Sequence, residues 1–329
     1  MHTSLCNGRA LVRAVVMALA ALALLAGTAL AEWQPQKPVE FVIMAGQGGG
    51  ADRLARLIQS IIQKNQFSPQ PFIPVNKGGG SGAEALRYLL DKRGDPHVIM
   101  ATLNSYYTTP LRNPKLGVDI KEFTPVARLA LDTFVLWVNA DSDIENLDDY
   151  VKAVKSANGQ WKMAGTGSGQ EDSLVTAMLE QEFGLKYTYI PFKGGGDVAK
   201  NLAGQHVGST VNNPSEAIGF LQAGKVRAIA AFTPDRIPAL KGVPTARELG
   251  HDLTYFMQRS IIAPPGIDKD VQAFYEGVFR KVHESADWTK YTSEKALDRA
   301  FLTGDALQEF FLKEREQHRK LLTALGEIK

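Results

Sequence analysis

Glycine-rich turns divide this chain into short units, and each turn separates an apolar run from a segment with helical periodicity. In the first unit, an apolar run covers residues 39–45, a turn with four glycines covers residues 46–50, and a helical apolar stripe covers residues 54–62. A continuous apolar run suits a buried strand, and a stripe suits a helix packed on its sheet, so this order predicts an α/β protein. The same order recurs at the glycines of residues 78–80, 165–169 and 194–196.

Two of these units are similar to each other and indicate two halves. Residues 76–80 read Asn-Lys-Gly-Gly-Gly and residues 192–196 read Phe-Lys-Gly-Gly-Gly, each between an apolar run and a helical pattern. Extended apolar segments at residues 126–138 and 255–263 flank the middle of the chain, and we interpret them as crossovers between two α/β lobes. Lobe 1 is predicted to comprise residues 32–132 plus 259–329, and lobe 2 residues 133–258.

The N-terminal segment has the three parts of a secretory signal peptide. Arg9 and Arg13 precede an Ala/Leu/Val-rich run over residues 14–26, and the segment ends in Ala29-Leu30-Ala31. This run of about a dozen residues is shorter than the roughly 20 that a membrane-spanning helix needs. We predict cleavage after Ala31 and a mature protein that begins at Glu32 in the periplasm.

Removing this segment changes the composition in two ways that bear on function. The only cysteine, Cys6, is lost, so the mature chain is expected to have no disulfide, reactive thiol or cysteine metal site. Of the 37 Lys and Arg residues, two leave with the segment, and the remaining 35 balance 35 Asp and Glu residues. A net charge of zero argues against nucleic acid or an anionic membrane surface as partner.

Polar groups that suit an anion follow several of the predicted strands. Ligands of α/β proteins bind at the carboxyl ends of strands, where backbone N–H groups at a helix start attract negative charge. The two long glycine turns, a polar loop after the strand at residues 97–101 and a helix start near Pro214 all meet this condition. Together they predict a carboxylate held between the lobes. The candidate ligand-binding residues are Gly46, Gln47, Gly48, Gly49, Asn104, Ser105, Tyr106, Thr166, Gly167, Ser168, Gln170, Asn212 and Asn213.

Each of these features also has a purely structural interpretation. Glycine turns are needed simply to pass from strand to helix. Ser81 and Ser168 stand three residues before Glu84 and Glu171, which is the spacing of a capping box. Tyr106 would fit a hydrophobic core as well as a cleft wall.

Catalytic interpretations fail on specific residues. Gly46-x-Gly48-x-x-Ala51 matches a dinucleotide-binding pattern, but the second strand ends at Asn76-Lys77, where NAD binding would need an acid. Adjacent Glu171 and Asp172 would point about 100° apart on a helix, which favours a helix-start role over acid/base catalysis. The histidines after residue 31 are too widely spaced to suggest a zinc site. We therefore expect no enzyme activity, no cofactor and no metal.

Seven segments, taken in order along the mature chain, resemble a known family. They are similar to motifs of the periplasmic receptors of tripartite tricarboxylate transporters, also called Bug or TctC-type receptors. The resemblance implies a two-lobed, type II-like periplasmic binding protein, each lobe a mixed sheet flanked by helices, with the ligand cleft between lobes. It also implies a monomer that delivers a small carboxylate to one large and one small membrane subunit, with transport driven by an ion gradient. The segments are residues 42–56, 76–84, 123–126, 164–170, 190–194, 224–228 and 243–245.

The resemblance also suggests how the ligand is held. In the family, the loop matching residues 45–49 meets one ligand carboxylate partly through water, and the loop matching residues 165–170 grips a carboxylate with hydroxyl and backbone donors. Many relatives that bind amino acids have an aspartate where this chain has Asn212. The absence of this acid favours a mono- or dicarboxylate as the ligand of this receptor. If Glu171 faces the cleft, a tricarboxylate is disfavoured unless a cation accompanies it. A receptor for a sensor kinase and an extracytoplasmic enzyme acting on a carboxylate remain the alternatives.

Overall fold

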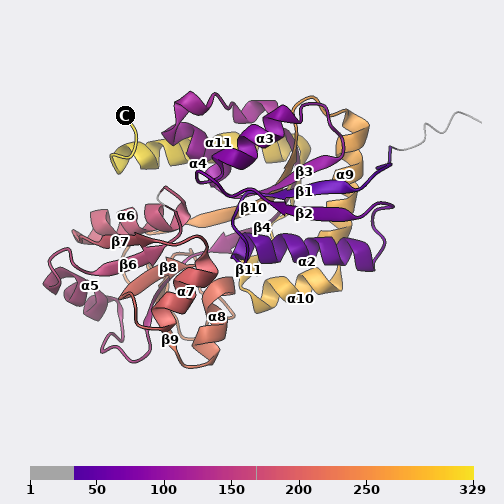
Figure 1. The fold of residues 1–329 in the computed structure, drawn as a ribbon. Coiled ribbons are helices and arrows are strands. Elements are labelled where there is room, and N and C mark those ends of the chain that lie inside the picture. The colour runs from indigo at the N-terminus through magenta and orange to yellow at the C-terminus, as the bar shows by residue number, and fades with distance from the viewer. Residues whose placement is uncertain (1–32, 168) are drawn as a thin grey trace, which may run out of the picture. The chain divides into compact units, whose positions relative to one another are not determined.

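The computed structural model describes residues 33–167 and 169–329 (Figure 1). The predicted signal peptide and the candidate ligand residue Ser168 lie outside the described residues. Residues Pro35–Lys329 form one compact unit. No helix in the described ranges combines the length and the apolar character needed to cross a bilayer.

The first sheet has seven strands and is mixed. They are β1 (Val39–Ile43), β2 (Phe72–Asn76), β3 (Val98–Thr102), β4 (Thr124–Thr133), β10 (Phe256–Ala263), β11 (Leu297–Asp298) and β12 (Leu302–Thr303). Their order is β11-β4-β10-β3-β1-β2, with β12 also paired to β4. β1 is parallel to β2 and β3, whereas β10 is antiparallel to β3 and β4.

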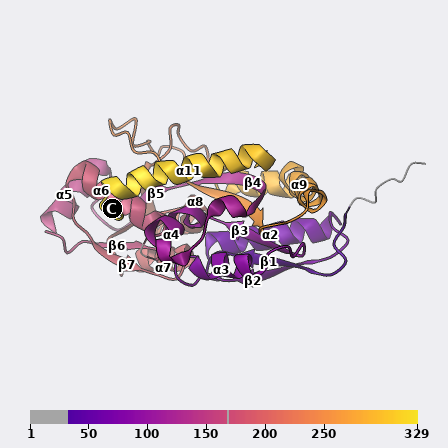
Figure 2. The same ribbon diagram turned by 90° about the horizontal axis from the view of Figure 1, so that it is seen from above.

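Helices cover both faces of this sheet. Neighbouring residues of a strand point to opposite faces, and on β1 Phe41 contacts the rings of Phe72 and Phe279, with centroids 6.0 and 6.4 Å away. Val42 belongs to an apolar cluster on the other face. Figures 1 and 2 show α3, α4 and α11 over one face and α2 and α9 over the other. The helices are α2 (Gly50–Lys64), α3 (Ala83–Asp91), α4 (Ser105–Arg112), α9 (Lys269–Glu284), α10 (Ala286–Glu294) and α11 (Gly304–Ala324), with short 3-10 turns at Pro114–Leu116 and Ile120–Glu122.

The second sheet has five strands and is also mixed. They are β5 (Val135–Asn139), β6 (Lys162–Gly165), β7 (Thr188–Pro191), β8 (Ser209–Asn212) and β9 (Val226–Ala231), in the order β7-β6-β8-β5-β9. β6 is parallel to β7 and β8, and β5 is antiparallel to β8 and β9. The predicted class, α/β with two mixed sheets flanked by helices, is therefore confirmed. The helices of this half are α5 (Leu147–Ser156), α6 (Glu171–Phe183), α7 (Gly195–Ala203) and α8 (Pro214–Gln222).

The chain passes twice between the sheets. Only Phe134 separates β4 of the first sheet from β5 of the second, so the first passage lies within the predicted crossover at residues 126–138. The second passage occupies residues 232–255, and the segment predicted as the second crossover is β10 of the first sheet. The lobe limits themselves, residues 32–132 plus 259–329 and 133–258, stay a prediction.

Helix starts differ in part from the expected capping patterns. The capping box at Ser81 and Glu84 is wrong, because α3 begins after left-handed Gly82 and the Glu84 carboxylate accepts the N–H of Gly79 at 3.1 Å. Asn213 precedes Pro214 at the start of α8 as expected, but its side chain does not cap the helix. At the other end of a helix, left-handed Gly184, with φ 63°, terminates α6.

Candidate ligand-binding site

A cavity of about 400 Å³ lies where the parallel strands of both sheets end. Loops that follow β1, β2 and β3 contribute from the first sheet, and loops that follow β6, β7 and β8 contribute from the second. Met257 and Arg259 of β10 complete the wall. The remaining lining residues are Ala45, Gly46, Gly49, Gly50, Ala51, Asn76, Gly78, Gly79, Ser81, Leu103, Thr166, Gly167, Gln170, Glu171, Asp172, Phe192, Lys193, Gly194, Gly195, Asn213 and Glu216.

About half of the candidate residues meet at this cavity. Gln47 and Gly48 belong to the same turn as Gly46 but are exposed and do not line it. Ser105 is fully buried outside the lining. The candidates that line it are Gly46, Gly49, Thr166, Gly167, Gln170 and Asn213.

Two other candidates have buried side chains that bond within the protein interior. Tyr106 is 0% exposed in the hydrophobic core, and its hydroxyl donates to the carbonyl of Ile120 at 2.8 Å. The expected polar loop is in fact the first turn of α4, which directs this ring against Phe311 of α11. Asn212 is likewise 0% exposed; its amide donates to the Gly195 carbonyl at 3.0 Å, and its oxygen accepts the N–H of Asn213. Neither side chain reaches the cavity.

A buried ion pair that was not predicted stands at the cavity wall. Arg259 Nε lies 3.0 Å from Asp132 Oδ2, and a second nitrogen, Nη2, bonds the same oxygen. The two residues are 4% and 1% exposed. Burial works against the charged guanidinium, but the adjacent Asp132 carboxylate outweighs it and raises the pKa of Arg259. Charged residues inside the apolar strand segments, Arg128 and Asp132 in β4 and Arg259 in β10, were the available signal. They did not reveal that Asp132 pairs with Arg259.

Three acidic side chains accept hydrogen bonds from backbone N–H groups around the cavity. Glu171 Oε1 accepts the N–H of Ser105 at 3.1 Å, and Glu216 Oε1 accepts that of Gly50 at 2.6 Å. Each contact joins a helix of the second sheet to the first residue of a helix of the first sheet. Asp172 Oδ2 accepts the N–H of Thr166 at 2.8 Å. The protein's own carboxylates thus accept hydrogen bonds from backbone N–H groups of the kind that were predicted to bind a ligand carboxylate.

Burial affects the ionisation of all three acids. Loss of solvation raises the pKa of Glu171 and of Glu216, and raises that of Asp172 well above its ordinary value. For Asp172 the charges of Glu216 and Glu171 raise the pKa further, which shows that the three carboxyls share one electrostatic environment. A proton or another positive charge near them relieves this repulsion.

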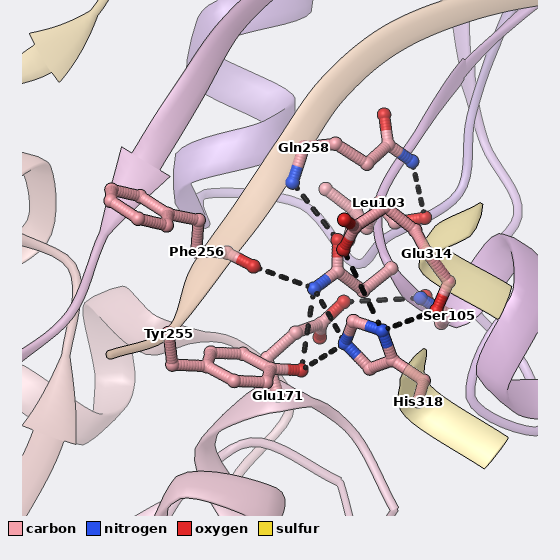
Figure 3. Close-up of polar contacts among 9 residues, drawn as sticks. Leu103, Ser105, Glu171, Tyr255, Phe256, Gln258, Glu314 and His318 are labelled. Carbon is pink, nitrogen blue, oxygen red and sulfur yellow. Dashed lines mark hydrogen bonds and ion pairs between the residues drawn. The ribbon is translucent and has the colours of Figure 1, made fainter. Parts of the chain in front are cut away.

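Asn104, a further candidate, does not line the cavity and lies at the centre of a buried polar network. Its oxygen accepts the N–H of Gln258 at 2.9 Å, and its amide nitrogen donates to the Phe256 carbonyl at 2.7 Å. Figure 3 shows Tyr255 and His318 gathered at the same point, next to Ser105 and Glu171. The network therefore connects the acid-bearing wall of the cavity to β10 and to α11.

The hydrogen bonds of His318 define its neutral form. Its Nδ1 lies 2.8 Å from the Glu314 carbonyl, which only accepts, so Nδ1 carries the proton. Its Nε2, 3.1 Å from the Tyr255 hydroxyl, is then the acceptor. Burial lowers the pKa of His318 to about 4, so the ring is uncharged at neutral pH. In the described part of the chain, no group of three or more His, Cys, Asp or Glu residues is arranged to hold a metal ion.

Two mixed sheets flanked by helices, linked by two passages of the chain and sharing a polar cavity at their strand ends, define the class of two-lobed solute-binding proteins. Residues 54–326 match the model of the tripartite tricarboxylate transporter family receptor, and the chain belongs to this family. The resemblance drawn from the seven segments is thereby confirmed.

Individual relatives agree with this assignment. Protein BugT of Bordetella pertussis is 24% identical over 265 residues, which cover 78% of this chain and 80% of BugT. The structure of the periplasmic binding protein BugD has a TM-score of 0.84 at 21% identity and covers 90% of this chain and 99% of its own. MatC from Rhodopseudomonas palustris with bound malate has a TM-score of 0.80 at 22% identity, covering 88% of this chain and 99% of its own. At these identities the structures establish the shared fold.

Proposed function

We propose that this protein captures a small organic carboxylate in the cavity between its two sheets and delivers it to the membrane subunits of a tripartite tricarboxylate transporter. The observation that carries the proposal is a cavity of about 400 Å³ built from loops of both sheets in a chain of the transporter receptor family. The fold neighbour MatC holds malate. The described cavity has room for a molecule of that size.

Secretion fits this function. We propose that residues 1–31 are removed after export and that the mature chain works in the periplasm as a monomer. Its balanced charge suits a receptor that meets small molecules and membrane proteins rather than nucleic acid.

Binding without chemistry is the proposed mechanism. The two lobes, residues 32–132 plus 259–329 and residues 133–258, close on the ligand by a hinge motion at the two passages between the sheets. The changes in backbone dihedral angles that this motion requires occur at Phe134 and in residues 232–255. No bond of the ligand is made or broken, which separates this proposal from that of an enzyme acting on a carboxylate.

A thermal-shift screen tests the proposal. Mature protein is heated with carboxylates, sugars and nucleotides, and a ligand at one hundred times its dissociation constant is expected to add about 2.7 kcal/mol to stability. Stabilisation by carboxylates, with no turnover of the bound compound, supports the receptor. A response to sugars or nucleotides alone contradicts it.

Gly78→Ala is expected to weaken binding of the stabilising carboxylate about tenfold or more, which corresponds to about 1.4 kcal/mol. A β-carbon at Gly78 would lie 2.7 Å from the backbone nitrogen of Gly46 and 2.8 Å from the carbonyl carbon of Ala45. Backbone atoms cannot rotate away as a side chain does, so the turn that lines the cavity must shift. Calorimetric titration measures the change.

Gly277→Ala is the matched control, because nothing lies within 4 Å of a β-carbon at this position of α9. It is expected to bind as the wild type does. Equal affinity for both variants would mean that the Gly46 turn does not contact the ligand.

A further inference from the structure

This inference rests on the proposed function and concerns how its two lobes close. We propose that Glu171 and Glu216 are latches between the lobes, each binding a helix start of the opposite lobe and so stabilising the closed form. In this role the two carboxylates are positioning groups, which hold the walls of the cavity together.

Both latch contacts cross from one lobe to the other. Glu171, the first residue of α6 in lobe 2, accepts the N–H of Ser105 of lobe 1 at 3.1 Å, as Figure 3 shows. Glu216 of α8, also in lobe 2, accepts the N–H of Gly50 of lobe 1 at 2.6 Å. Because each bond joins residues of different lobes, an opening motion at the hinge has to break both.

The latches supply an acceptor that two helices of lobe 1 lack. The start of a helix leaves backbone N–H groups without an acceptor inside the helix, and the side chain of the N-cap residue usually accepts one of them. The N-cap residues of α2 and α4, Gly49 and Asn104, make no such side-chain bond. Carboxylates of lobe 2 instead bond the first residue of each helix, where the helix dipole favours negative charge.

The backbone around Glu216 leaves space for its carboxylate. A β-carbon on Gly195, the first residue of α7, would overlap both carboxylate oxygens, and one on Gly50 would lie 3.1 Å from Oε1. The glycine turns of the two lobes also approach each other, since a β-carbon on Gly194 would lie 3.7 Å from the Cα of Gly49. Glycines of both lobes therefore allow the close approach in which this latch forms.

Positive charge on lobe 1 strengthens the Glu216 latch. Burial raises the pKa of Glu216, but the N–H of Gly50 and the charges of Arg53 and Arg259 act against this rise and favour the ionised carboxylate. Both arginines belong to lobe 1. Arg53 also donates from Nη2 to the carbonyl of Ser215, next to Glu216, at 3.4 Å. Electrostatic attraction therefore acts between the lobes at this point.

The latches change the balance between open and closed receptor. A hydrogen bond to a charged group contributes enough free energy to change an equilibrium about tenfold or more. A ligand that binds the closed form has an apparent affinity proportional to the fraction of receptor that is closed. The latches thus increase affinity through closure, and delivery of the ligand requires both of them to separate.

Amide hydrogen exchange of the mature protein, measured by NMR without added ligand, tests this inference. In Glu216→Ala, the N–H groups of both Gly50 and Ser105 are expected to exchange about tenfold faster, because loss of one latch favours the opening that breaks the other. Glu171→Ala is expected to have the same two effects. An acid with only a local role would change the exchange of its own partner alone.

A control amide and a control variant accompany this test. The N–H of Thr166, which Asp172 accepts within lobe 2, should keep its wild-type exchange rate in both alanine variants. Glu180→Ala is the matched control variant, since its carboxylate accepts the N–H of Tyr187 at 3.0 Å within lobe 2. It should leave the exchange of both latch amides unchanged.

A conservative variant checks the chemistry of the latch. Glu216→Gln keeps an oxygen for the N–H of Gly50, so it should restore most of the protection that Glu216→Ala loses. Faster exchange confined to the variant's own partner amide, or acceleration that extends equally to Thr166, overturns the inference. Because no ligand takes part, either result leaves the proposed function intact, and only a failure of carboxylates to stabilise the protein in the thermal-shift screen contradicts that function.

Discussion

Asp132→Asn is expected to lower the free energy of unfolding by about 3 to 5 kcal/mol, the usual cost of leaving one partner of a buried ion pair alone. The side chains of Arg259 and Asp132 are only 3% and 1% exposed, so water cannot replace the lost carboxylate. The asparagine has nearly the same shape, which limits the change to charge. Urea unfolding followed by circular dichroism, with linear extrapolation to water, measures the difference.

Two further variants show whether the effect belongs to the buried pair. Replacing both partners, Asp132→Leu with Arg259→Met, should recover most of the lost stability, because no uncompensated charge is left. Asp252→Asn breaks an ion pair with Arg247 in which the side chains are 82% and 51% exposed, and it should cost no more than about 1 kcal/mol. A loss of that small size for Asp132→Asn would mean that the pair is hydrated and not structurally important.

Acidification from pH 7 to pH 5 is expected to remove about 2 kcal/mol of stability through His318, at about 1.36 kcal/mol for each unit of pKa difference. Burial holds the pKa of this ring at about 4 in the folded protein, against 6.5 in the unfolded chain. Between these values the unfolded state binds more protons, so stability rises with pH. The contribution is complete above pH 6.5, falls as the pH drops below it, and levels off near pH 4.

His318→Gln isolates this contribution from that of the buried acids. The raised pKa values of Glu171 and Asp172 make these acids increase stability as the pH falls, which is opposite to the effect of His318. Glutamine accepts the Tyr255 hydroxyl bond without titrating, so the difference in stability between variant and wild type should shrink as the pH falls from 7 to 5. His206→Gln, at an exposed position, should keep the wild-type slope. Parallel stability curves for wild type and His318→Gln would show that His318 is not held neutral by burial.

Local patterns explain why part of the site was predictable. Gly46, Gly49, Thr166 and Gly167 follow apolar strands directly, and the ends of parallel strands meet at one edge of a sheet, so these residues reach the cavity. Tyr106 follows a strand too. Its side chain is nevertheless in the core, because α4 starts at Ser105 and turns the ring toward α11. The direction of a helix after a strand depends on what packs against it, which no local pattern specifies.

Apolar periodicity and turn residues act over a few neighbouring positions, so the α/β class, the glycine turns and the resemblance to a transporter receptor could be predicted from the sequence. Which groups meet across the cavity depends instead on how the whole chain folds. Glu171 is bound to an amide 66 residues away, Glu216 to one 166 residues away, and Arg259 to a carboxylate 127 residues away. Burial and neighbouring charge set the ionisation of these groups, and both arise only when the two sheets bring distant residues together.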